Sequence, residues 1–158
     1  MGRLKRDATL WIQWPQAILI LGISLLGAWI AYKQVRIATA KLNLELYDRR
    51  FKVFEAARNL VSQVMREAHV GLGNISAFNL GVADATFLFD SDVEGYLTAL
   101  RKKAIALHTK GEQLRGMEEP SERRNALVDQ IADLEMDFSI EYERMGQVFK
   151  PYLKLGNI

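Results

Sequence analysis

Residues 17–32 read AILILGISLLGAWIAY, an apolar stretch without a charged side chain. Extended back to Leu10, it reaches roughly 20 residues, the length that a helix needs to cross a bilayer core of about 30 Å. Tryptophan and tyrosine favour the membrane–water interface, and they stand at both ends of the stretch. The predicted interface residues are Trp11, Trp14, Trp29 and Tyr32. The stretch therefore predicts a transmembrane helix over residues 10–32, after a basic tail over residues 1–9.

Two other interpretations explain the stretch less well. A cleaved signal peptide would combine a basic start and an apolar core with a small-residue site such as Ala38-Thr39-Ala40. Lys33 and Arg36 separate that site from the apolar stretch, whereas signal peptidase cuts just past it. A buried helix of a soluble protein usually carries a polar stripe, and residues 17–32 offer only Ser24.

Small side chains recur along the predicted span. Gly27 and Ala31 are four residues apart, and a row with seven-residue spacing comprises Ala17, Ser24, Ala31 and Ala38. Small residues let transmembrane helices approach one another closely. We therefore expect the span to contact the lipid bilayer and to self-associate through Ala17, Ser24, Gly27 and Ala31.

Basic residues on the two sides of the span predict its orientation, because lysine and arginine favour the cytoplasmic side. Residues 3–6 hold three of them, close together. The larger and more spread set on the other side is Lys33, Arg36, Lys41, Arg49, Arg50 and Lys52. The larger set favours a cytoplasmic C-terminal domain, and the opposite orientation stays open.

Composition bounds the rest of the chain. Of its 158 residues, those after the span are enough for one small domain with a core. The chain has no cysteine, which excludes disulfides and thiol chemistry. A formal net charge of +2 gives no indication of a nucleic-acid partner, and we expect none.

The region after the span has helical periodicity. Neither glycine nor proline occurs between Trp29 and Val70, which favours a stalk helix over residues 33–70 that continues from the span, while a hinge near Lys33–Lys41 stays open as the alternative. Its apolar stripe comprises Leu42, Leu46, Val53, Ala57, Leu60, Val64 and Ala68. Gly71 and Gly73 should end this helix by supplying left-handed conformations.

Three more helices are predicted in residues 71–158, packed with residues 42–70. The first runs from about Ser76 to Phe89 and places Phe78, Val82, Ala85 and Phe89 on one face. Ser91 and Glu94 form a capping-box pattern at the start of the second. Its stripe comprises Val93, Leu97, Leu100, Ala104, Leu107 and Leu114. Ser121 should cap the last, whose stripe comprises Leu127, Ile131, Leu134, Phe138, Tyr142, Met145 and Phe149.

The last two helices have opposite charge. The earlier one is basic, with Lys103 among its cations, and the later one is acidic. Complementary edges favour an antiparallel hairpin, with the acidic pairs, such as Asp137 and Glu141, on a solvated face. The sequence thus predicts an all-α fold: one N-terminal transmembrane helix continuing into a small helical bundle with a long antiparallel hairpin.

No pattern points to catalysis. His69 and His108 are the only histidines, and neither has the spaced helical partner that a metal site would show. Serines lack a plausible histidine–acid arrangement, and no glycine-rich phosphate loop follows a strand. We therefore expect no enzyme activity, no catalytic or metal site and no cofactor.

Arg49 and Arg50 interrupt an otherwise apolar helix face. They either face solvent and pair with Glu45 and Asp48 or contact another protein. A second corner, residues 87–92, combines aromatic and acidic side chains. The candidate partner contacts are Arg49, Arg50, Phe87, Phe89, Asp90 and Asp92.

The segments KLNLELYDRRFKVFEA (41–56), ATFLFDSDVEGYL (85–97) and FKPYL (149–153) resemble small uncharacterised bacterial membrane proteins. The resemblance implies a bacterial inner-membrane location with a cytosolic helical domain, and it supplies no catalytic residues. The leading hypothesis is a membrane-anchored interaction or assembly module that self-associates or docks a cytosolic protein. The alternative is an oligomerising, membrane-perturbing effector of toxin or antiphage type.

Overall fold

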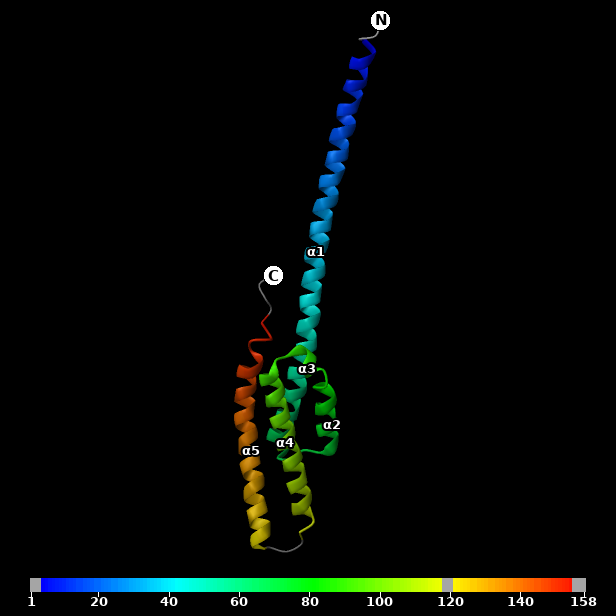
Figure 1. Ribbon diagram of the computed structural model, residues 1–158. Helices are drawn as coiled ribbons and strands as arrows, with labels where there is room; N and C mark the ends of the chain where they lie inside the picture. Colours follow the sequence, from blue (N-terminus) through cyan, green and yellow to red (C-terminus); the bar gives the residue numbers. More distant parts are fainter. Residues whose placement is uncertain (1–3, 118–120, 155–158) are drawn as a thin grey trace. The chain divides into compact units, whose positions relative to one another are not determined.

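The computed structural model describes residues 4–117 and 121–154, with side chains described from Ile18 onwards. All regular secondary structure in these residues is helical, which confirms the all-α fold (Figure 1). The helices are α1 (Leu4–Glu67), α2 (Leu72–Gly81), α3 (Ala85–Leu88), α4 (Ser91–Arg115) and α5 (Glu122–Phe149).

The chain divides into two compact units, Met1–Asn43 and Leu44–Ile158. Helix α1 is continuous from Leu4 to Glu67, as the lack of glycine and proline after Trp29 predicts. In the first unit, the described side chains are exposed from Ile18 to Thr39. Among the described residues, α1 is the one helix long and apolar enough to cross a membrane.

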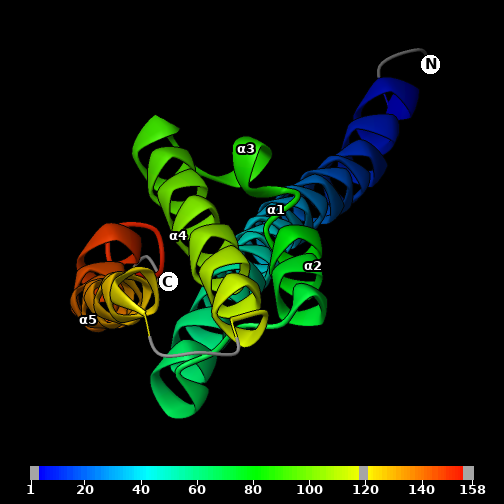
Figure 2. The ribbon, with the colours of Figure 1, turned by 90° about the horizontal axis from the view of Figure 1, so that it is seen from below.

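The second unit is a helical bundle with its own apolar core. Helix α4 lies between α5 on one side and α2 on the other, and it packs against both (Figure 2). The largest fully buried side chains come from α1, α4, α5 and the α1–α2 turn: Val61, Val64, Val70, Val93, Leu100, Leu107, Phe138, Met145 and Phe149. Burial of these side chains is the main favourable contribution to folding of the bundle.

The predicted stripe of α4 is confirmed from Val93 to Leu107, with Leu114 only partly buried, and the stripe of α5 needs one correction. Tyr142 was expected inside but is 48% exposed, and Glu141 occupies the inward position instead. Successive helical residues differ by about 100° around the axis, so the edge of a stripe is poorly defined by periodicity alone. Lys103 on α4 lies beside this inward carboxylate and offsets the cost of burying its charge.

The turn after α1 differs from the glycine-based turn expected from the sequence. Ala68 has a φ of 49°, and none of the described glycines has a positive φ. Gly71 instead precedes α2 with an extended φ of −85°, and its N–H donates to the side chain of Asn74. The left-handed step at an alanine is energetically unfavourable, so packing around the turn must hold it in place.

The predicted helix over residues 76–89 forms as two shorter pieces, α2 and α3. Helix α2 begins four residues earlier than expected, at Leu72, and ends at Gly81. The predicted inward face is confirmed nevertheless, because Phe78, Val82, Ala85 and Phe89 are all buried. The break follows Gly81, where α2 comes close to Ala56 of α1.

Gly81 makes that close approach. A Cβ atom built on Gly81 would lie 2.6 Å from the Cβ of Ala56, well inside van der Waals contact. Replacing Gly81 by alanine should therefore lower the free energy of unfolding by about 1–3 kcal/mol, because α2 must shift away from α1. The matched control is Gly95→Ala on α4, where nothing lies within 4 Å. That variant should gain roughly 0.5–1 kcal/mol from helix propensity. Urea unfolding of the full-length protein in detergent measures both, and a stabilised Gly81 variant would contradict the close packing.

The two predicted helix caps behave differently. Ser121 caps α5 as expected, and its Oγ accepts a hydrogen bond from the N–H of Arg124 at 3.2 Å. The capping box at Ser91 is wrong, because the N-cap of α4 is Asp90 and it makes no side-chain cap bond. The carboxylate of Asp90 accepts instead from the hydroxyl of Tyr152, which follows α5, at 2.9 Å.

Candidate interaction surfaces

Three segments distant in sequence meet around Arg50. Its Nε donates to the carbonyl oxygen of Leu88 at 3.1 Å. Its guanidinium lies 6.0 Å from the ring centre of Phe89 and 5.7 Å from that of Tyr152, within the range of cation–π attraction. Arg50 therefore joins α1, the α3–α4 connection and the segment after α5 into one corner of the bundle.

The aromatic residues of this corner form a continuous cluster. The ring of Phe149 meets those of Phe54, Phe89 and Tyr96 edge to face, with centroids 5.4, 5.4 and 6.2 Å apart. Such pairs add to the stability that burial alone provides. The hydrogen bond to Asp90 raises the pKa of Tyr152, so the phenol donates throughout the neutral range.

The six candidate partner contacts thus separate into two groups. Arg50 and Phe89 are engaged within the bundle. Arg49 is exposed and pairs with Glu45 on its own helix at 2.9 Å, as the solvent-facing alternative expected. Phe87 is 86% exposed, and Asp90 and Asp92 are exposed beside it in sequence. The exposed group, Arg49, Phe87, Asp90 and Asp92, is the part that another protein can reach.

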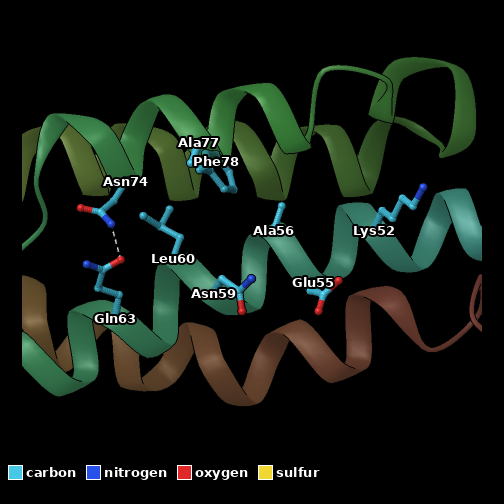
Figure 3. A pocket seen from close by; sticks show the side chains of 9 residues that line it. All are labelled: Lys52, Glu55, Ala56, Asn59, Leu60, Gln63, Asn74, Ala77 and Phe78. Atoms are coloured by element: carbon cyan, nitrogen blue, oxygen red, sulfur yellow. Dashed lines mark hydrogen bonds between the residues drawn. The ribbon is translucent and has the colours of Figure 1, made fainter.

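A shallow groove of about 270 Å³ lies between α1 and α2 (Figure 3). It is lined by four apolar residues, Ala56, Leu60, Ala77 and Phe78, and by five polar residues, Lys52, Glu55, Asn59, Gln63 and Asn74. A hydrogen bond from Asn74 to Gln63 crosses one end. Four of the polar residues follow one another at helical spacing on α1 and read in the sequence as a solvated face, so the groove becomes visible only when α2 packs beside them.

A cluster of charged side chains around one buried carboxylate joins α4 to α5. Among the described residues, Glu141 is the one charged residue that is buried. Its Oε1 lies 3.0 Å from Nζ of Lys103, which also lies 3.0 Å from Oδ2 of Asp137. Arg144 is more distant, at 3.9 Å, and Oε2 of Glu141 has no hydrogen-bond partner among the described residues. The expected charge pairing of the hairpin is present, but the solvated position expected for Glu141 is wrong.

The pKa values of two groups in this cluster are raised. Burial raises the pKa of Tyr96, the carboxylate of Glu141 adds to the shift, and Arg144 opposes it. Burial alone would lower the pKa of Lys103, but the hydrogen bonds from Lys103 to Glu141 and Asp137 outweigh it and raise that pKa. The hydroxyl of Tyr96 also donates to the backbone carbonyl of Glu141 at 3.0 Å. The folded bundle therefore favours the protonated form of both side chains.

This protonation predicts an alkaline limit to stability. A group with a raised pKa binds more protons in the folded state than in the unfolded state, so stability falls as pH rises past the unfolded pKa. Unfolded tyrosine and lysine lose their protons near pH 10, so we expect a level free energy of unfolding up to about pH 9 and a decline above about pH 10. Urea unfolding at a series of pH values measures the slope. Tyr96→Phe, the control, should be less stable at neutral pH and should show a shallower decline. An unchanged slope would exclude Tyr96 as a contributor.

The two histidines, far apart in sequence, lie together at the α1–α2 turn. Their ring centroids are 6.3 Å apart. Nδ1 of His108 lies 2.9 Å from the carbonyl oxygen of Val70, and Nε2 of His69 lies 3.3 Å from the guanidinium of Arg115. Within the described residues, no three histidine, cysteine, aspartate or glutamate side chains are grouped to hold a metal ion. The two rings thus connect the turn after α1 with α4 through the contacts to Val70 and Arg115.

The predicted span residues that the structure describes are all exposed. Ser24 satisfies its hydroxyl on its own helix by donating to the carbonyl of Ile20 at 2.8 Å. Lys33 lies over the ring of Trp29, 5.7 Å from its centre. Gly27, Ala31 and Tyr32 are also exposed. The side chains of Trp11, Trp14 and Ala17 lie outside the described part.

No protein-family model, curated protein or solved structure matches this chain. The resemblance to small bacterial membrane proteins stays a prediction.

Proposed function

We propose that this protein is a single-pass membrane protein of the bacterial inner membrane, whose cytoplasmic bundle is an interaction and assembly module. Between Ile18 and Ile30, α1 carries no charged residue and presents a row of exposed large apolar side chains: Ile18, Leu19, Ile20, Leu21, Ile23, Leu25, Leu26, Trp29 and Ile30. An uncovered apolar surface of this kind marks an interaction with a membrane or another protein.

The length and flanks of this row favour a bilayer as its environment. A helix of roughly 20 residues crosses the hydrocarbon core. Lys33 follows the row directly, and a lysine at the end of a span can extend toward the headgroups. The bundle in the second unit has its own buried core, so the row is not required to complete that core.

Carbonate extraction of membranes from cells that make the full-length protein tests the anchor. The wild type should remain in the membrane pellet. Replacing Ile23 and Leu26 by lysine places two charges in the span, each costing about 2.5–3.5 kcal/mol at its centre, and should release the protein. The matched control replaces Ala40 and Asn43 by lysine beyond the span and should leave the protein in the pellet. Extraction of the wild type would reject membrane anchoring.

The exposed corner of the bundle is the proposed contact for another protein. Phe87, Arg49 and Asp92 are accessible, whereas Arg50 and Phe89 hold the bundle together. A contact variant should therefore replace Phe87 and Arg49 and leave Arg50 in place. Crosslinking in membranes, compared with the wild type, measures the loss of association. Unchanged crosslinking would exclude this corner as the contact.

A further inference from the structure

Helix α1 carries a seam of exposed side chains with alternating spacings of three and four residues. Its members are Leu21, Ser24, Ala28, Ala31, Val35, Ala38 and Leu42. This spacing is the heptad repeat that brings a and d positions of two helices together. The larger members, Leu21, Val35 and Leu42, are 62%, 65% and 56% exposed. Nothing in the described unit covers the seam.

We infer that the seam, Leu21 to Leu42, pairs with the same seam of a second copy of this chain in a parallel arrangement. The inference rests on the proposed membrane anchoring, because a bilayer gives every copy the same orientation. Identical helices that enter a membrane in one direction can place equal positions opposite each other about a symmetry axis. The seam also continues beyond the apolar stretch. In a helix, Leu42 lies roughly 15 Å past Tyr32, so lipid chains do not account for its exposure.

The placement of charge selects this face of α1. With Val35 and Leu42 at a positions, Lys33 falls at f and Arg36 at b, both on the side away from the seam. The flanking positions on either side of Val35 are Gln34 and Thr39, which carry no charge and permit close approach. From Leu21 to Leu42, the one charged flanking residue of the seam is Lys41, at the g position beside Leu42.

The neighbouring apolar row shows the contrast. Ile30, Lys33 and Ile37 also follow three- and four-residue spacing, so pairing on that face would bring Lys33 of one copy against Lys33 of another. Like charges placed opposite each other disfavour association. Ser24 is the polar residue within the seam, and its hydroxyl already donates a hydrogen bond to a carbonyl oxygen of its own helix. It therefore does not disfavour association through the seam.

Cysteine crosslinking tests the inference directly, since the natural chain has no cysteine and every signal comes from the residue introduced. Single variants Val35→Cys, Ala38→Cys and Leu42→Cys place a thiol on the seam. Arg36→Cys, Ile37→Cys and Ala40→Cys, the matched controls, place it elsewhere at the same depths. The full-length variants are oxidised in native membranes with copper phenanthroline and separated without reductant.

We expect a disulfide-linked dimer from the three seam positions and none from the controls. A disulfide needs Cα atoms within about 7 Å, which facing a and d positions reach and outward positions do not. Dimers that are strongest at Ile37→Cys, equal at all six positions or absent would overturn the inference. Carbonate extraction of the same membranes separates the two proposals. If the protein stays in the membrane pellet but the dimers do not follow the seam positions, only the seam is rejected. If the protein is released from the membrane, the membrane anchor is rejected as well.

A second pair of variants tests the seam by adding charge at positions other than the one that carries the cysteine. In the Ala38→Cys background, replacing Val35 and Leu42 by lysine should abolish the dimer. Replacing Ile37 and Asn43 by lysine adds the same charge off the seam and should leave the dimer intact. Equal losses in both variants would show that added charge, and not the seam, controls association.

Discussion

Replacing Phe149 by alanine should destabilise the bundle more than any other single truncation that the structure suggests. Phe149 is fully buried at the end of α5, where its ring meets the rings of Phe54, Phe89 and Tyr96. Removing a buried phenylalanine ring costs about 3–5 kcal/mol, because its partners lose contacts and a cavity remains. The total free energy of unfolding of a typical domain is only about 5–15 kcal/mol, so the variant should be close to unfolding at physiological temperature.

Urea unfolding of the full-length protein in detergent, monitored by far-ultraviolet circular dichroism, measures the loss in free energy of unfolding. The matched control is Phe87→Ala, which removes the same ring from a position that is 86% exposed. A surface change of this kind should alter the free energy of unfolding by less than about 0.5 kcal/mol. Similar losses at both positions would contradict the placement of Phe149 in the core.

Much of the architecture could be predicted from the sequence because it depends on local pattern. The inward positions of α4, such as Leu97 and Leu100, follow directly from the spacing of apolar residues. The cap at Ser121 is equally local, since its hydroxyl bonds an N–H only three residues away. The continuity of α1 agrees with the lack of glycine and proline after Trp29, although that pattern alone left a hinge near Lys33–Lys41 open.

The features that could not be predicted depend on partners distant in sequence. Asp90 bonds Tyr152 rather than capping its own helix, and those residues are separated by 62 positions. Arg49 and Arg50 look equivalent in the sequence, but adjacent helical residues point about 100° apart. Only Arg50 therefore reaches Leu88, while Arg49 pairs locally with Glu45.

The inward orientation of the Glu141 side chain is the clearest case in which a long-range interaction overrides a local pattern. A lone buried carboxylate is strongly unfavourable, so periodicity assigns an acidic residue to the surface. Lys103 on α4 compensates its charge at 3.0 Å, which permits Tyr142 to take the outer position. The exchange explains why one edge of the predicted α5 stripe is wrong and the rest is right.

Replacing Lys103 by methionine should therefore destabilise the α4–α5 hairpin by about 2–4 kcal/mol, because it leaves the Glu141 carboxylate buried without its nearest cation. The expected loss is below that of a fully buried pair, since Lys103 is itself 27% exposed and Arg144 stays within 3.9 Å of the carboxylate. Urea unfolding of the full-length protein at neutral pH measures it. The matched control is Arg49→Met, which breaks an exposed pair with Glu45 and should cost only tenths of a kcal/mol.

Combining Lys103→Met with Glu141→Leu separates a buried charge from a simple loss of packing. The double variant replaces the ion pair by apolar side chains of similar size, which often restores or increases stability. We expect it to recover most of the free energy that Lys103→Met loses, although Asp137 then has no partner at Lys103. If the double variant is as unstable as the sum of its single changes, the two side chains act independently and Glu141 is not held inward by Lys103. Recovery would instead establish that pairing between α4 and α5 determines which edge of α5 faces the core.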